Sequence, residues 1–223
     1  CQNTLGKWIY EGSHGYAQDY KKAVAWWTES AKQNNVDAIA NLGFCYMYGL
    51  GVNTDTVTAN QLFVKALKLG NKNLVTVHDS LAREGVVFSA LLLGKCYRMA
   101  YGVTRSETTA LRYYKMAADR GSVDGMRESA LLMRSAKDDK EALAMFKKAM
   151  EKGDVTSTYY YGKMHCEGRG TAVDAKTGFD FLRKAAEKDF AAAQYELAEA
   201  YANGNGVVHN DSLALVWYRK AAL

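Results

Sequence analysis

The stretch LAEAYANGNGVVHNDSLALVWYRKAAL, residues 197–223, decides the fold. We expect a first helix to run to Tyr201, because the glycines of the following GNGV loop supply a turn that ends it. A second helix is expected to begin near Asn210 and to carry Trp217 and Tyr218 between alanines. The same helix–loop–helix unit recurs along the whole chain, so the sequence predicts a repeat protein.

The period of the repeat is read from one small residue in each second helix. Its spacings are 36, 51, 32, 36 and 36 residues, at Ala23, Ala59, Ala110, Ala142, Gly178 and Ala214. Large apolar residues follow three and four positions later and a small residue follows seven positions later, which places all of them on one helix face. Four positions before each small residue stands a side chain suited to N-capping, at Asp19, Asp55, Ser106, Asp138, Asp174 and Asn210. These positions predict six second helices with defined starts.

The first helix of a unit is marked by a leucine–glycine pair, as at Leu5-Gly6, Leu42-Gly43 and Leu93-Gly94. Glycine inside a helix costs about 1 kcal/mol relative to alanine. We therefore expect a second helix to pass close to each of these glycines. Proline is absent from the chain, which suits a protein built only of helices.

The combined pattern, Leu-Gly-x-x-Tyr-x-x-Gly-x-Gly-Val and then Ala-x-x-Trp-Tyr-x-Lys-Ala-Ala, resembles the Sel1-like repeat family, a branch of the tetratricopeptide superfamily. The resemblance covers nearly all of the chain. It implies an all-α fold, an α-solenoid of antiparallel helix pairs wound as a tetratricopeptide-like right-handed superhelix with a concave binding face. It also implies that the protein is an adaptor and not an enzyme.

On this pattern we expect a single repeat domain over residues 1–223. Its approximate units are 1–34, 35–70, 86–121, 122–153, 154–189 and 190–223. Residues 71–85 are left over, and we interpret Asn73 to Glu84 as an extra helix or as the remnant of a decayed repeat.

Candidate partner-binding residues follow from the resembled architecture, in which first helices line the concave side. The helix face opposite the packed one then carries basic, aromatic and methionine side chains. They are Lys7, Tyr10, Phe44, Met47, Lys95, Arg98, Arg127, Arg134, Tyr159, Lys163 and Tyr195. We expect a groove for an acidic or C-terminal peptide segment. Its charged floor would consist of Lys95, Arg98, Arg127, Arg134 and Lys163. The alternative interpretation is a row of solvated charges on an ordinary surface.

The function expected from these features is a non-enzymatic scaffold or adaptor that binds a partner protein or an acidic peptide. The alternative is an inhibitor, immunity or regulatory subunit that occludes one partner enzyme. No catalytic residue, metal site, cofactor or small-molecule substrate is expected, because HExxH, GxSxG and zinc-finger spacings are absent from the sequence. The paired glycines of the loops are interpreted as helix C-caps and not as phosphate cradles.

The histidines and cysteines are interpreted as structural. Neighbours such as His165 and Cys166 point about 100° apart on a helix, so they do not share a site. Cys45 and Cys96 occupy equivalent positions in different units, about 10 Å apart by helix-packing distances. That separation is too long for a disulfide, so both are expected to be buried free thiols.

Charge and hydropathy bound the partners and the compartment. The net charge of +5 is mild, and nucleic acid is not expected as a partner. No run of 18 apolar residues occurs, so we expect a soluble chain without a transmembrane segment. Its compartment is not readable, although a periplasmic, secreted or lipid-anchored protein is an alternative. Membrane contact is expected only if Cys1 carries a lipid.

Overall fold

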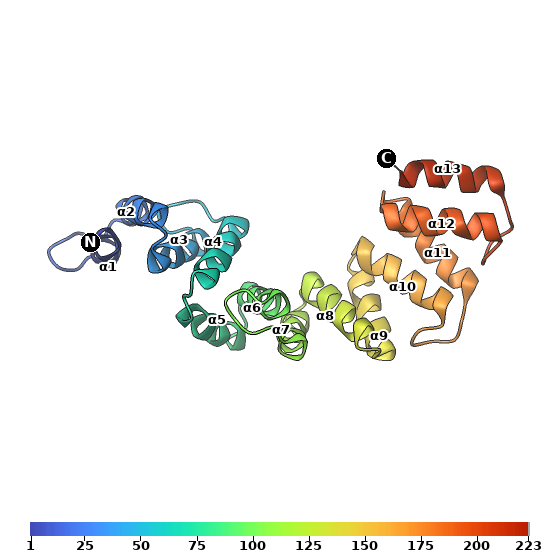
Figure 1. Cartoon of the computed structure of the whole chain (residues 1–223), viewed down its shortest axis with the longest axis horizontal. Coiled ribbons are helices and arrows are strands. Elements are labelled where there is room, and N and C mark those ends of the chain that lie inside the picture. The colour runs from blue at the N-terminus through green and yellow to red at the C-terminus, as the bar shows by residue number, and fades with distance from the viewer. Residues whose placement is uncertain (223) are drawn as a thin grey trace. The chain divides into compact units, whose positions relative to one another are not determined.

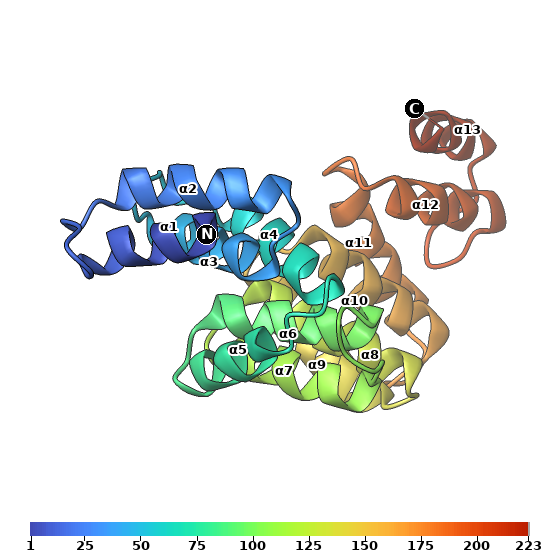
Figure 2. The ribbon, with the colours of Figure 1, turned by 60° about the vertical axis from the view of Figure 1, so that its left-hand side comes forward.

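The computed structural model describes residues 1–222, and these form thirteen α-helices (Figure 1). In chain order they are α1 (Gln2–Glu11), α2 (Tyr20–Lys32), α3 (Val36–Tyr48), α4 (Thr56–Lys68), α5 (Asn73–Arg83), α6 (Val87–Met99), α7 (Glu107–Asp119), α8 (Val123–Ser135), α9 (Asp139–Glu151), α10 (Val155–Glu167), α11 (Ala175–Ala186), α12 (Ala191–Asn203) and α13 (Asp211–Ala221). Apart from α5, consecutive helices form antiparallel pairs, as α1 and α2 show in a second view (Figure 2). The predicted all-α class of paired helices is confirmed.

The helices fall into two compact units, residues 1–113 and 114–223. The main core of the first unit joins Ile39 of α3 and Phe63 of α4 to Leu74 of α5 and Leu92 of α6. The second unit has a comparable core, in which side chains of α11 such as Leu182 pack on α12. The single domain and its unit boundaries stay predictions.

Five of the six predicted capping side chains do cap a second helix; for example, Asp55 accepts hydrogen bonds from the backbone N–H groups of Val57 and Thr58. The expectation for Asp138 is wrong, because its side chain accepts no capping hydrogen bond. Only residues 136–138 connect α8 to α9, and Asp138 has φ −85° and ψ 65°. Because the connection is short, the backbone of Asp138 does not adopt the extended conformation from which the other aspartates accept hydrogen bonds from the first N–H groups of the helix.

The close approach expected at the mid-helix glycines is confirmed at Gly43. A Cβ atom added there would lie 2.6 Å from Cε1 of Phe63, which belongs to the paired helix α4. The interpretation of the loop glycines as helix caps is also confirmed. Gly49, Gly168 and Gly204 all end first helices in the left-handed conformation that glycine adopts without strain.

Residues 71–85 contain α5, which packs on α6 without a partner helix of its own. Its buried face carries Leu74, His78 and Ala82. His78 is fully buried, and its Nδ1 lies 2.9 Å from the hydroxyl of Ser89 on α6. The inserted helix is therefore an integral part of the first unit's core.

No helix within residues 1–222 is both long enough and apolar enough to cross a membrane.

Candidate functional site

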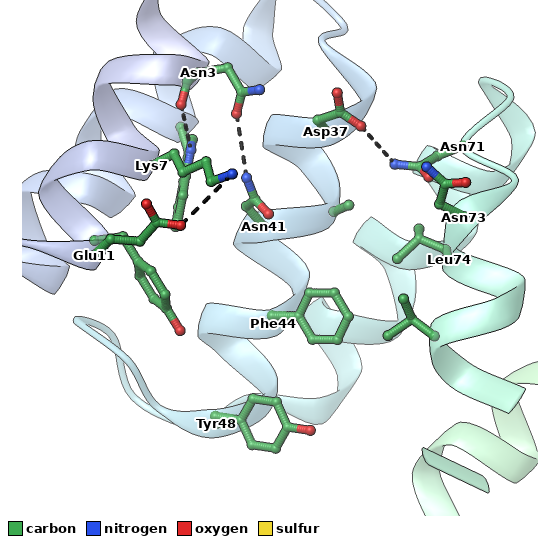
Figure 3. A pocket seen from close by; sticks show the side chains of 14 residues that line it. Asn3, Lys7, Glu11, Asp37, Asn41, Phe44, Tyr48, Asn71, Asn73 and Leu74 are labelled. Carbon is green, nitrogen blue, oxygen red and sulfur yellow. Dashed lines mark hydrogen bonds and ion pairs between the residues drawn. The ribbon is translucent and has the colours of Figure 1, made fainter. Parts of the chain in front are cut away.

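A groove of about 600 Å³ lies in the first unit between α1, α3 and the inserted helix α5 (Figure 3). It extends along α3 from Asp37 to Tyr48. The helices α1 and α3 are first helices of their pairs, so the groove lies on the side of the repeats where a binding face was predicted. Its third wall comes from α5, which interrupts the regular repeat.

Asparagines line one side of this groove. The side-chain N–H of Asn41 donates to Oδ1 of Asn3 over 3.4 Å, and the indole N–H of Trp27 donates to the backbone carbonyl of Asn3 over 3.2 Å (Figure 3). Asn71 donates to Oδ1 of Asp37 over 3.2 Å. The side-chain amide of Asn73 makes no hydrogen bond to any residue that the structure describes. The row of amides therefore keeps unused donors and acceptors toward the groove.

The apolar part of the groove is held rigidly by the core beneath it. The ring of Phe44 stacks on His78 with centroids 5.6 Å apart and meets Phe63 edge-on at 4.8 Å. Leu74 of α5 is buried beside it, whereas Val77 is 42% exposed. The groove thus presents an apolar surface that water reaches, made of the firmly packed ring of Phe44 and the exposed side chain of Val77.

The charges in the groove nearly cancel. Nζ of Lys7 lies 3.8 Å from Glu11, and both side chains are exposed, so the pair is loose. Asp37 uses only Oδ1 for its bond from Asn71. Burial is the main reason that the pKa of Tyr10 is raised, and nearby ionisable groups such as Cys45 raise it further. Tyr10 is therefore neutral near pH 7. The groove carries one net negative charge.

Of the predicted binding residues in the first unit, Lys7, Tyr10 and Phe44 line this groove. Met47 instead packs against the core between α3 and α4. Lys95 is exposed and Arg98 is half-buried, both on α6 and outside the groove.

In the second unit the predicted cations pair with carboxylates of the same chain. Arg127 lies 2.5 Å from Asp124 and 2.9 Å from Asp154. Burial would lower the pKa of Arg127, but these two hydrogen-bonded carboxylates outweigh that effect and raise it. The guanidinium is thus already neutralised within the fold.

The remaining predicted residues of the second unit have equally defined surroundings. Arg134 lies 3.7 Å from Glu167 and over the ring of Tyr160, and Lys163 pairs with Glu196. Tyr159 is only 8% exposed, beside the ring of Phe190. Tyr195 is 52% exposed and packs against Tyr218. The contact of these side chains with a partner stays a prediction.

Sequence reasoning missed the groove residues that do not follow the repeat pattern. Asn41 lies one position away from the expected outward stripe, and Asn73, Leu74 and Val77 belong to the inserted helix. A usable signal was present in α5, where apolar residues at Leu74, Val77 and Leu81 mark an amphipathic helix. It does not say which helices that segment joins.

Cys45, Cys96 and His165 lie outside the groove. Cys45 and Cys96 are buried free thiols as predicted, and burial raises their pKa values to about 11 and about 12. His165 is packed edge-on against Tyr161, as expected, although neither of its ring nitrogens has a hydrogen-bond partner among the described residues. Within residues 1–222, no three His, Cys, Asp or Glu side chains are placed to hold a metal ion.

The chain matches the family model of the Sel1 repeat at residues 1–35, 36–71, 87–122, 132–154, 155–190 and 191–223. Solved structures share its fold. A Sel1 repeat protein from Oxalobacter formigenes is 25% identical over 99% of this chain and 82% of its own, with a TM-score of 0.64. A protective antigen of uropathogenic Escherichia coli strains, which displays an SLR fold, is 24% identical with a TM-score of 0.64. That match covers 99% of this chain but 52% of the antigen, so the chain spans about half of that protein's length.

Proposed function

The chain belongs to the Sel1 repeat family, and from this premise we propose that it is a non-enzymatic module that binds a partner protein on its first helices. Proteins of this repeat class typically mediate protein interactions. The observation that carries the proposal is the groove between α1, α3 and α5, which combines unused amide groups with an exposed apolar surface. Such mixed surfaces, with polar groups around an aromatic anchor, are typical of protein recognition sites.

The acidic character of the partner stays a prediction. Its support is weaker for the second unit, because Arg127, Arg134 and Lys163 already have carboxylate partners. An acidic segment would have to displace these internal carboxylates before it gained an ion pair. Lys95 in the first unit is exposed and is the better candidate for such a contact.

Site-specific photo-crosslinking tests the proposal. A benzophenone amino acid replaces Tyr48 or Tyr195, which are 51% and 52% exposed on first helices. Val57 and Val216, 67% and 46% exposed on second helices, are the matched control positions. In an extract of the source organism we expect the same protein to be crosslinked from both first-helix positions and not from the controls. Crosslinking from the second-helix positions alone would refute the proposal.

A further inference from the structure

The groove has the length of a short extended peptide. Its lining runs along α3 from Asp37 to Tyr48, which is about 16 Å at a rise of about 1.5 Å per helical residue. An extended chain advances about 3.3 Å per residue, so the groove accommodates about five residues.

The amides favour an extended segment over a helix. The side-chain N–H₂ of Asn3, the carbonyl oxygen of Asn41 and the whole amide of Asn73 have no hydrogen-bond partner among the described residues. An amide can donate to a backbone carbonyl and accept from a backbone N–H at the same time. A helix already pairs those backbone groups internally, whereas an extended chain leaves them free.

One part of the groove selects an apolar side chain. The ring of Phe44 packs against the core cluster that contains Leu74 and stacks on the buried His78, and the exposed side chain of Val77 lines the same groove. An aliphatic or aromatic residue placed on them would be withdrawn from water, which favours binding.

The charge of the groove discriminates against acidic segments. Lys7 and Glu11 offset each other, which leaves Asp37 as the net charge. Oδ2 of Asp37 has no hydrogen-bond partner among the residues described, and the side chain is exposed. A lysine or arginine of the partner can therefore bind there without displacing an internal ion pair.

We infer that the groove between α1, α3 and α5 binds an extended, non-acidic segment of the partner protein. The segment presents its backbone to Asn3, Asn41 and Asn73, places an apolar side chain on Phe44 and Val77, and places a basic side chain beside Asp37. This inference rests on the proposed function, since it specifies the part of the partner that is bound. It assigns a binding role to the inserted helix.

A phage-displayed library of random short peptides, selected on the full chain, tests this inference. We expect enriched peptides to share an apolar residue and a nearby lysine or arginine. Peptides selected on the Asp37→Asn variant should lose the preference for a basic residue, because the negative charge is gone, and should keep the preference for an apolar residue. The asparagine oxygen still accepts the hydrogen bond from Asn71. Val77→Arg should weaken binding of the wild-type-selected peptides by about tenfold or more, by filling the apolar position and repelling the basic residue.

Val57→Arg is the matched control, because it introduces the same exposed charge on α4, away from the groove, and should leave peptide binding unchanged. Circular dichroism confirms that each variant is folded. The inference is overturned by no enrichment, by an acidic consensus, by apolar residues at helical spacing, or by full binding to Val77→Arg. Crosslinking of the native partner from Tyr48 and Tyr195 would still support the proposed function in those cases, so the two failures are distinguishable.

Discussion

The phenol of Tyr113 on α7 donates a hydrogen bond of 2.6 Å to Oδ1 of Asp79 on the inserted helix α5. Arg83 donates to the other oxygen of the same carboxylate over 2.9 Å. Burial alone would raise the pKa of Asp79, but the bonds from Tyr113 and Arg83 outweigh it, and the pKa is lowered. Burial and the neighbouring carboxylate raise the pKa of Tyr113 to about 12. This contact fastens the inserted helix to the regular repeat beside it.

Removal of the Tyr113 hydroxyl should destabilise the fold in a pH-dependent way. A hydrogen bond to a charged group contributes about 1.5–3 kcal/mol, so we expect Tyr113→Phe to lower the free energy of unfolding by about 2 kcal/mol at pH 7. The contribution of a carboxyl with a lowered pKa is complete above its unfolded value, about 3.9, and is lost as the pH falls through the folded value. Urea unfolding at neutral and acidic pH should therefore show a smaller difference in acid.

Tyr97→Phe is the control for this prediction. Tyr97 stacks on Tyr113 with centroids 5.7 Å apart, yet its hydroxyl has no hydrogen bond to the described residues. The change should alter stability by less than about 0.5 kcal/mol. Equal losses for Tyr113→Phe at both pH values would show that the hydroxyl acts through packing and not through the Asp79 charge.

His78 should make the stability of the protein depend on pH between about 4 and about 6.5. Burial lowers its pKa to about 4 from the ordinary value of about 6.5, because the imidazolium would be desolvated among Phe63 and Phe88. In this window the unfolded chain takes up the proton before the folded chain does. The free energy of unfolding should therefore fall by about 3 kcal/mol as the pH drops across the window.

The variant His78→Phe isolates this effect, since it keeps a ring in the cluster and removes the proton site. Chemical unfolding from about pH 7 to about pH 4 should show a slope that is shallower than wild type by up to one proton. Ser89 loses its partner in the variant, so Ser89→Ala, which keeps His78, serves as a comparison. An identical slope in wild type and His78→Phe would contradict the prediction.

Gly43→Ala should destabilise the first unit although alanine is the better helix former. The added Cβ would meet the Phe63 ring at 2.6–2.9 Å, and that ring is fully buried and cannot move aside. Overpacking costs about 1–3 kcal/mol, against a gain of about 1 kcal/mol in helix propensity. We expect a net loss of about 1 kcal/mol. In the double variant with Phe63→Leu, thermal unfolding should show a loss smaller than the sum of the two single changes.

The regular part of the fold could be predicted because its signals are local. Capping aspartates and mid-helix glycines act within one helix pair, so residues such as Asp55 and Gly43 identify both a helix and its partner. Asp138 fails as a cap because the length of the preceding loop, and not the residue type, fixes the backbone there. Local chemistry thus defines the repeats better than their connections.

The candidate site could be predicted only in part, because it depends on contacts between distant residues. The stripe of outward positions, which follows from the helix period, includes Lys7, Tyr10 and Phe44, and these line the groove. It also gave Tyr159, whose exposure is removed by Phe190 at the start of a later helix. The groove itself arises where α5 interrupts the repeat, so no repeat-based rule could place Asn73 or Val77 in it.

Charge reversal at Arg127 should disturb the fold before it affects any partner. Arg127 bridges Asp124 and Asp154, and Asp154 also caps α10 by accepting from the backbone N–H of Ser157. Arg127→Glu would place a further carboxylate beside Asp124, Asp154 and Glu128, and we expect a loss of about 2 kcal/mol in the free energy of unfolding, since removing one partner of a half-buried ion pair leaves the other charges uncompensated.

Lys95→Glu is the matched reversal, because Lys95 is exposed and should tolerate the change within about 0.5 kcal/mol. Unfolding in guanidinium measures the stability of both variants, and a binding assay measures their affinity for the crosslinked partner. Together the two measurements separate an effect on the fold from an effect on binding. An acidic partner segment on the first unit would lose affinity with Lys95→Glu at unchanged stability. If Arg127→Glu were as stable as wild type, its carboxylate partners would be dispensable, and Arg127 would be free to bind an acidic segment as the sequence suggested.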